Sequence, residues 1–211
     1  MADWVADSHD ASDADFVMVD KKFATVYVFD AVARLRSSSP VLLGAASGDD
    51  SVDGIGSRPI AEVRPEERTT PAGRFVAERG RNATGEDVIW VDYNAAVSLH
   101  RVRTTNPAEH RLDRLATAAI ADKRISYGCI NVPSAFYDEY IRPLFASRRV
   151  VVYVLPEVKS IQQVFRFYDV AARHRPDRSN ANFPGSPRLP LESVLLKIER
   201  TRPQDLQPLQ Y

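Results

Sequence analysis

Short stretches of alternating hydrophobic and polar residues recur along the chain and predict several β-strands. Residues 15–31 alternate around a polar Asp-Lys-Lys segment, which predicts a hairpin. Shorter strand patterns occur at 40–47 and after the Thr-Thr-Pro-Ala-Gly turn, where the strand includes Phe75. The run RRVVVYVLPE, 148–157, is almost continuously hydrophobic, which is typical of a strand buried on both faces. The N-terminal part of the core is therefore expected to be a β-sheet.

Two further strand patterns lie in 87–102, and the second places His100 on the face opposite Val97 and Leu99. Helical spacing begins after Pro133, and a second amphipathic pattern covers 160–174. The polar, alanine-rich segment between 104 and 125 predicts a surface excursion with a short helix, which is either a lid or a loop. The last residues are rich in proline and predict a tail.

Composition narrows the range of partners. The 211 residues suit one enzyme-sized domain, and 28 basic residues balance 28 acidic ones, so no nucleic-acid partner is expected. Cys129 is the only cysteine, which excludes an internal disulfide and a multi-cysteine zinc site. Residues 1–14 form a polar, acidic leader without the basic and apolar segments of a signal peptide, so membrane insertion of this chain is not expected.

Cys129 and His100 are the candidate chemical pair. A free thiol is mostly protonated near neutral pH, and a nearby imidazole or helix start makes it a better nucleophile. Cys129 follows Gly128 and precedes the predicted helix, while His100 stands at the end of a strand. Spacing alone leaves the alternative that Cys129 is a buried thiol and His100 a structural residue.

The residues around Cys129 resemble a known signature. SYGCIN, 126–131, is similar to the Ser/Thr-His-Gly-Cys-hydrophobic-Asn signature of the L,D-transpeptidases, the YkuD-like catalytic domains of bacterial cell-wall enzymes. TPAGRF, AVSLHRV and RRVVVYVLPE resemble other segments of that family, in the same order along the chain. The resemblance implies a mainly β fold, a mixed β-sandwich or partial barrel with one or two packed helices. We expect a catalytic domain over 15–157 and a helical, proline-rich extension over 158–211.

The resemblance also implies a reaction. Cys129 would attack the diaminopimelate–D-alanine bond of a peptidoglycan tetrapeptide stem, and the thioester would pass to an amine, giving a 3→3 crosslink or an attached wall protein. His100 would act as the base, oriented by the backbone carbonyl of Arg101, and the N–H groups of Tyr127, Gly128 and Cys129 would stabilise the oxyanion. Ser126, Tyr127, Gly128, Asn131 and Arg101 are thus predicted oxyanion or substrate residues. The family implies no cofactor or metal, a periplasmic or cell-wall location, a role in cell-wall organisation and cell shape, and inhibition by carbapenems.

Two departures from the signature keep alternatives open. Tyr127 stands where the family has histidine, and His110 has a spacing to Ser126 closer to the family interval than His100 has. We favour His100 because a strand holds a base more rigidly than the charged segment around His110 does. The alternative functions are a hydrolase on the same scaffold, a catalytically silent peptidoglycan-binding module, and a cytosolic thiol enzyme. A periplasmic role requires a leader removed from this chain or another export route.

Overall fold

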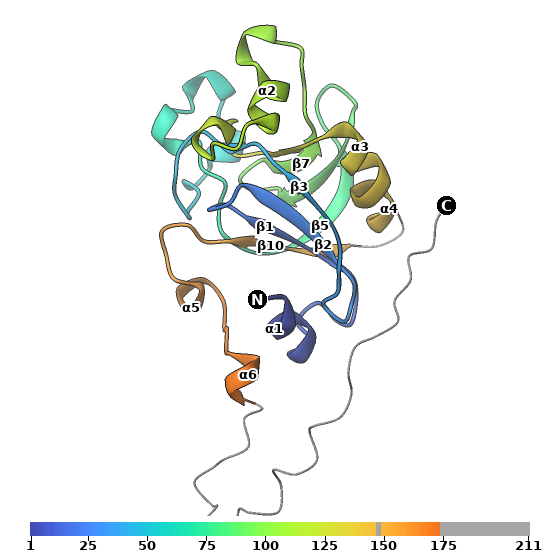
Figure 1. The fold of residues 1–211 in the computed structure, drawn as a ribbon. Helices are drawn as coiled ribbons and strands as arrows, with labels where there is room; N and C mark the ends of the chain where they lie inside the picture. The colour runs from blue at the N-terminus through green and yellow to red at the C-terminus, as the bar shows by residue number, and fades with distance from the viewer. Residues whose placement is uncertain (147–148, 174–211) are drawn as a thin grey trace, which may run out of the picture. The chain divides into compact units, whose positions relative to one another are not determined.

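The computed structural model describes residues 1–146 and 149–173, and its largest element is an eight-stranded mixed sheet (Figure 1). The strand order is β3-β2-β1-β10-β5-β6-β7-β9, and a separate pair joins β4 to β8. The strands are β1 (Phe16–Asp20), β2 (Thr25–Phe29), β3 (Leu35–Pro40), β4 (Leu43–Gly44), β5 (Gly73–Arg81), β6 (Asp87–Asp92), β7 (Val97–Arg101), β8 (Arg124–Ser126), β9 (Ile130–Val132) and β10 (Val150–Leu155). β1 runs parallel to β10 and β7 parallel to β9, while the other neighbours in the large sheet are antiparallel. The predicted mainly β fold with a mixed sheet is confirmed.

The large sheet is nearly closed on itself. β3 and β9 stand at its two ends, and the chain that leaves β3 bridges back to β9 at Leu42 and Asn131. The N–H of each residue donates to the carbonyl of the other at 2.9 Å. This closure holds β9, which begins directly after Cys129, between β7 and the segment after β3.

The helices of the described residues are short. They are α1 (Ala2–Asp7), α2 (Arg111–Ala116), α3 (Ser134–Phe136), η6 (Tyr137–Ile141, a π-helix), α4 (Arg142–Leu144), α5 (Ile161–Val164) and α6 (Val170–Arg173). Single 3₁₀ turns are η1 (Ile55–Ser57), η2 (Ile60–Glu62), η3 (Pro65–Glu67), η4 (Pro107–Glu109) and η5 (Ala121–Lys123). α3, η6 and α4 follow one another, which confirms the helix predicted after Pro133. Pro143 cannot donate an i→i−4 bond, and the wider π turn directly precedes α4, which contains it.

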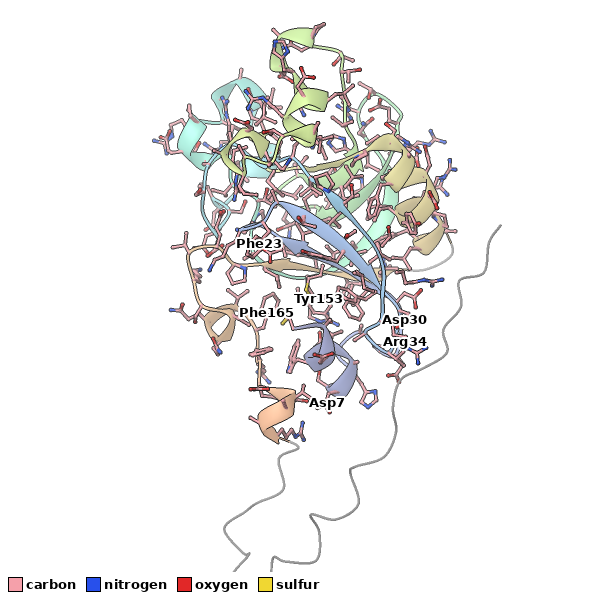
Figure 2. All side chains as sticks on the ribbon, viewed as in Figure 1. Asp7, Phe23, Asp30, Arg34, Tyr153 and Phe165 are labelled. Atoms are coloured by element: carbon pink, nitrogen blue, oxygen red, sulfur yellow. The ribbon has the colours of Figure 1, made fainter. Side chains whose placement is uncertain are left out.

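The helical pattern at 160–174 does not form one helix. A capping box between Ser160 and Gln163 starts α5, but Phe165 adopts an extended conformation and ends it. Phe165 is buried and its ring packs against Tyr153, with centroids 6.1 Å apart (Figure 2). Burial of this aromatic side chain on the sheet outweighs the local helical periodicity, so the chain breaks between α5 and α6.

Both faces of the central strands are buried. On β1, Val17 and Val19 face the core that also holds the residues of α3 and η6. Phe16 and Met18 face a second core, formed with residues of α1 and the segment after β10. β10 alternates in the same way, which explains why its sequence is continuously hydrophobic.

The predicted leader contributes to the second core. Trp4 and Val5 of α1 are buried, and the Asp10 carboxylate accepts hydrogen bonds from Tyr153 at 2.5 Å and Arg74 at 2.6 Å. In Figure 1, α1 lies close to α6, and residues of the two helices are in contact. The domain boundaries at 14/15 and 157/158 stay predictions, and the proline-rich tail over 174–211 lies outside the described residues.

Candidate functional site

One cavity of about 270 Å³ brings together five of the predicted residues. Its lining includes Ser126, Tyr127, Cys129, His100 and Asn131. The sheet explains this convergence, because β7 and β9 are parallel neighbours and pair His100 directly with Asn131. Residues far apart in sequence thus face one space beside the thiol.

The turn that carries Cys129 is held by internal hydrogen bonds. The Ser126 hydroxyl donates to the Cys129 carbonyl at 2.6 Å and accepts from the Gly128 N–H at 3.1 Å. Gly128 has a φ of 127°, and a Cβ at this position would lie 2.7 Å from the carbonyl oxygen of Thr69. The turn therefore requires glycine both for its backbone angle and for the close approach of Thr69.

The TPAGRF segment, 70–75, holds the same turn through a hydrogen bond from Thr70. The buried Thr70 hydroxyl donates to the Gly128 carbonyl at 2.9 Å and accepts from the Gly44 N–H at 2.9 Å. The hydrogen bond between Thr70 and Gly128 therefore joins the TPAGRF and SYGCIN segments. Because the Gly128 N–H is already bonded to Ser126, the predicted oxyanion donors narrow to the N–H groups of Tyr127 and Cys129.

The thiol of Cys129 contacts the start of β7. Its Sγ lies 3.5 Å from both the backbone nitrogen and the hydroxyl of Ser98, and 3.6 Å from the carbonyl oxygen of Ala96. Ser98 is buried and was not among the predicted site residues. The strand alternation offered one signal for it, since Ser98 shares the His100 face of this strand. A thiolate at this position would have the Ser98 N–H and hydroxyl as donors.

His100 is held at both ring nitrogens. Its Nδ1 lies 2.7 Å from the Arg101 carbonyl oxygen, so Nδ1 carries the proton and Nε2 is the basic nitrogen. Nε2 lies 3.4 Å from the Asn131 amide nitrogen, in position to accept its N–H. Burial is the main cause that lowers the pKa of His100 to about 4. The hydrogen bond with the Arg101 carbonyl opposes this shift, and the charges of Arg103 and Arg111 lower the pKa further. The imidazole is therefore neutral at pH 7.

Arg101 contributes through its backbone. Its guanidinium forms ion pairs with Asp87 at 2.8 Å and Asp138 at 2.6 Å and stacks on the Tyr137 ring. The Asp138 hydrogen bond is the largest cause of a raised Arg101 pKa. With two carboxylate partners for the side chain, the contact that joins Arg101 to the site is the carbonyl expected to orient His100.

Two arginines that the sequence did not single out contact residues of the cavity lining, and one of them, Arg111, lines the cavity itself. Arg68 stacks 4.0 Å over the ring of Tyr127, which fixes that partly exposed side chain. Arg111, the first residue of α2, donates to the Asn131 side-chain oxygen and thereby connects the excursion after β7 to His100. These contacts join residues many positions apart, so no local sequence pattern indicated them.

His110 lies away from the thiol. Its side chain is 69% exposed, and its Nδ1 is 3.2 Å from the Asp113 carboxylate. It lines a different cavity, together with Arg111 and other residues of the excursion. The geometry therefore favours His100 as the base, although the role itself stays a prediction.

The described part of the chain contains neither a metal-binding cluster nor a membrane-spanning helix. Among residues 1–146 and 149–173, no group of three or more His, Cys, Asp or Glu side chains is arranged to hold a metal ion. No helix within these residues is long and apolar enough to cross a membrane.

Comparison with known proteins gives structural similarities only. No protein-family model and no curated protein matches the sequence. The Ldtfm–avibactam carbamoyl enzyme has a TM-score of 0.38 and 16% identity, over 68% of this chain and 49% of that one. The catalytic domain of an E. faecium L,D-transpeptidase has a TM-score of 0.38 and 16% identity, over 68% and 98%. The helical cell shape determining protein Pgp2 from Campylobacter jejuni has a TM-score of 0.44 and 14% identity, over 69% and 49%.

The chain spans about half the length of the first of these proteins. Similarity at this level does not assign a family or transfer a residue role.

Proposed function

We propose that this protein is an L,D-transpeptidase-type acyltransferase that acts on peptidoglycan stem peptides through Cys129. The proposal is carried by the meeting of Cys129 with His100 and Asn131 at one cavity. The basic nitrogen of His100 faces the Asn131 amide, because the Arg101 carbonyl holds the other ring nitrogen. A thiol that shares a cavity with an oriented, neutral imidazole suits nucleophilic acyl transfer.

In the first half of the reaction, Cys129 attacks the carbonyl between the L-centre of diaminopimelate and the terminal D-alanine. Nε2 of His100 takes the thiol proton, the new S–C bond forms, and the C–N bond to D-alanine breaks. The proton on Nε2 passes to the nitrogen of D-alanine, which therefore leaves with a free amino group. A thioester remains on Cys129. The N–H groups of Tyr127 and Cys129 stabilise the oxyanion during this step.

In the second half, an amine attacks the thioester and gives a proton to His100. The S–C bond breaks, and the thiolate recovers the proton. A stem-peptide amine gives a 3→3 crosslink, and a protein lysine gives an attached wall protein. Water in place of the amine gives the carboxypeptidase activity of the alternative hydrolase.

The resting site favours hydrogen bonds over an ion pair for activating the thiol. Because His100 is neutral at pH 7, it adds no positive charge to the cavity that holds the sulfur. The Ser98 N–H and hydroxyl are the nearest donors and would stabilise negative charge on Sγ as the proton leaves. The substrate places the working compartment of the proposal in the periplasm or cell wall, where the reaction would affect wall organisation and cell shape.

The test is to incubate the protein with a purified tetrapeptide stem and follow intact mass and D-alanine release. The proposal predicts a thioester adduct and one D-alanine released for each, both lost in Cys129→Ala. Adding an amine acceptor should replace hydrolysed tripeptide with a crosslinked product. A folded protein with a titratable thiol that forms no adduct and releases no D-alanine would exclude the proposal and favour the silent binding module.

A further inference from the structure

The cavity beside Cys129 has an excess of positive charge. Two arginines, Arg103 and Arg111, and one carboxylate, Glu109, contribute to its lining, while His100 is neutral at pH 7. Arg103 is paired with Glu86 at 2.7 Å, and Glu86 lines the adjacent cavity. The partners of Arg111, Glu109 and Asn131, both line the Cys129 cavity, so Arg111 is the arginine whose contacts lie inside it.

The side chain of Arg111 is largely buried, and only some of its guanidinium N–H groups donate hydrogen bonds within the described residues. Its side chain is 14% exposed, and it donates to the Glu109 carboxylate and to the Asn131 side-chain oxygen. A guanidinium has five N–H donors in a planar fork that suits a carboxylate. Among contacts within the described residues, Nε and one N–H of Nη1 are engaged, which leaves three N–H groups for a ligand.

The segment that carries Arg111 is braced from within. Arg114 donates to the carbonyls of Glu109 and Asp122, both at 2.9 Å. The buried Lys123 ammonium donates to three carbonyls at the end of α2, at 2.8 to 3.1 Å. These contacts make the excursion a fixed wall of the cavity, so the position of Arg111 is set before a ligand arrives.

We infer that Arg111 recognises a free carboxylate of the acyl donor, namely the C-terminal carboxylate of the residue that leaves. This inference rests on the proposed function for the choice of donor. Arg111 also holds Asn131, whose amide faces Nε2 of His100. The carboxylate would thus bind at one end of a hydrogen-bonded chain that ends on the base, which links recognition of the correct donor to the reacting group.

The test compares two peptides that differ at one group. A tetrapeptide stem with a free C-terminal carboxylate and the same peptide with a C-terminal carboxamide are titrated into the Cys129→Ala protein by calorimetry. A charge-assisted, bidentate contact predicts that the acid binds about 10- to 100-fold more tightly than the amide. Arg111→Gln should weaken binding of the acid to the level of the amide, and Arg111→Lys should retain only part of the preference.

Arg36→Gln is the matched control, because Arg36 is a largely exposed arginine that pairs with Asp15 and does not line the Cys129 cavity. It should leave the ratio of the two affinities unchanged. Equal affinities for the two peptides in Cys129→Ala, or equal weakening of both by Arg111→Gln, would overturn the inference. Because binding is measured without the thiol, a preference for the acid that depends on Arg111 supports the inference even if the wild type forms no thioester. Thioester formation without a preference for the acid would support the proposed function but would exclude the role inferred for Arg111.

Discussion

A buried lysine supports, through Thr70, the turn that carries Cys129, and replacing it gives a sharp test of the packing. Lys21 is fully buried, and its ammonium donates to the Asp49 carboxylate at 2.7 Å, the Thr70 carbonyl at 2.8 Å and the Gly48 carbonyl at 2.5 Å. Burial alone would raise the pKa of Asp49, but hydrogen bonds from Lys21 and three backbone N–H groups hold it at about 2. Asp49 therefore stays ionised inside the protein and depends on Lys21 for its countercharge.

Lys21→Met keeps most of the side-chain volume and removes the charge. Removal of one partner from a buried ion pair costs about 3–5 kcal/mol, because the remaining charge is left uncompensated. Backbone N–H groups of Glu157, Val158 and Lys159 still bind the Asp49 carboxylate, so we expect the lower part of that range. The loss of the Thr70 contact should also loosen the segment that holds Gly128 and slow acylation of Cys129.

Urea unfolding followed by circular dichroism measures the loss as a change in the free energy of unfolding. The control is Lys22→Met, because Lys22 is exposed and its substitution should change stability by less than about 0.5 kcal/mol. Adding Asp49→Asn to Lys21→Met should recover part of the loss, since it removes the unpaired charge. A loss below about 1 kcal/mol for Lys21→Met, or no recovery in the double variant, would refute the reasoning.

Three further predictions concern the site. Because the folded pKa of His100 is depressed from 6.5 to about 4, the unfolded chain binds this proton first, so stability should fall by about 3 kcal/mol from pH 6.5 to 4. His100→Gln should flatten that part of the urea-unfolding profile, and an unchanged slope would contradict the burial argument. Ser98→Ala should slow alkylation of Cys129 by iodoacetamide about 5-fold at neutral pH through loss of one donor, whereas Ser98→Thr should restore it; equal rates in all three proteins would exclude this role. Ser126→Ala removes two hydrogen bonds from a buried turn and should lower unfolding stability by about 2 kcal/mol, and a change near zero would show that the turn does not need them.

Local patterns predicted the central strands of the large sheet but not its two end strands, β3 and β9. Period-two alternation located β1, β2, β6 and β7, and the continuous hydrophobic run located β10. These predictions hold because the strands are buried in a regular way, on one or both faces. The break between α5 and α6 was missed because burial of Phe165 against Tyr153 depends on a distant strand.

The site was predictable only in part for the same reason. His100 and Cys129 carry recognisable chemistry, and the sequence favoured both. Ser98 and Arg111 gain their importance from contacts with residues 31 and 20 positions away. Lys21 sits in a polar segment typical of an exposed turn, yet its ammonium is enclosed by Asp49 and backbone carbonyls. Such long-range contacts depend on the tertiary fold and leave little trace in local sequence.

The most direct test of an activated thiol at this site is covalent reaction with a carbapenem, followed by intact-protein mass spectrometry. The wild type should gain one adduct, Cys129→Ala should gain none, and His100→Ala should react far more slowly than His110→Ala. If His110→Ala reacted more slowly than His100→Ala, the base would be His110, in the excursion after β7. No adduct on a folded protein with a titratable thiol would contradict the assignment of Cys129 as the nucleophile of an acyltransferase.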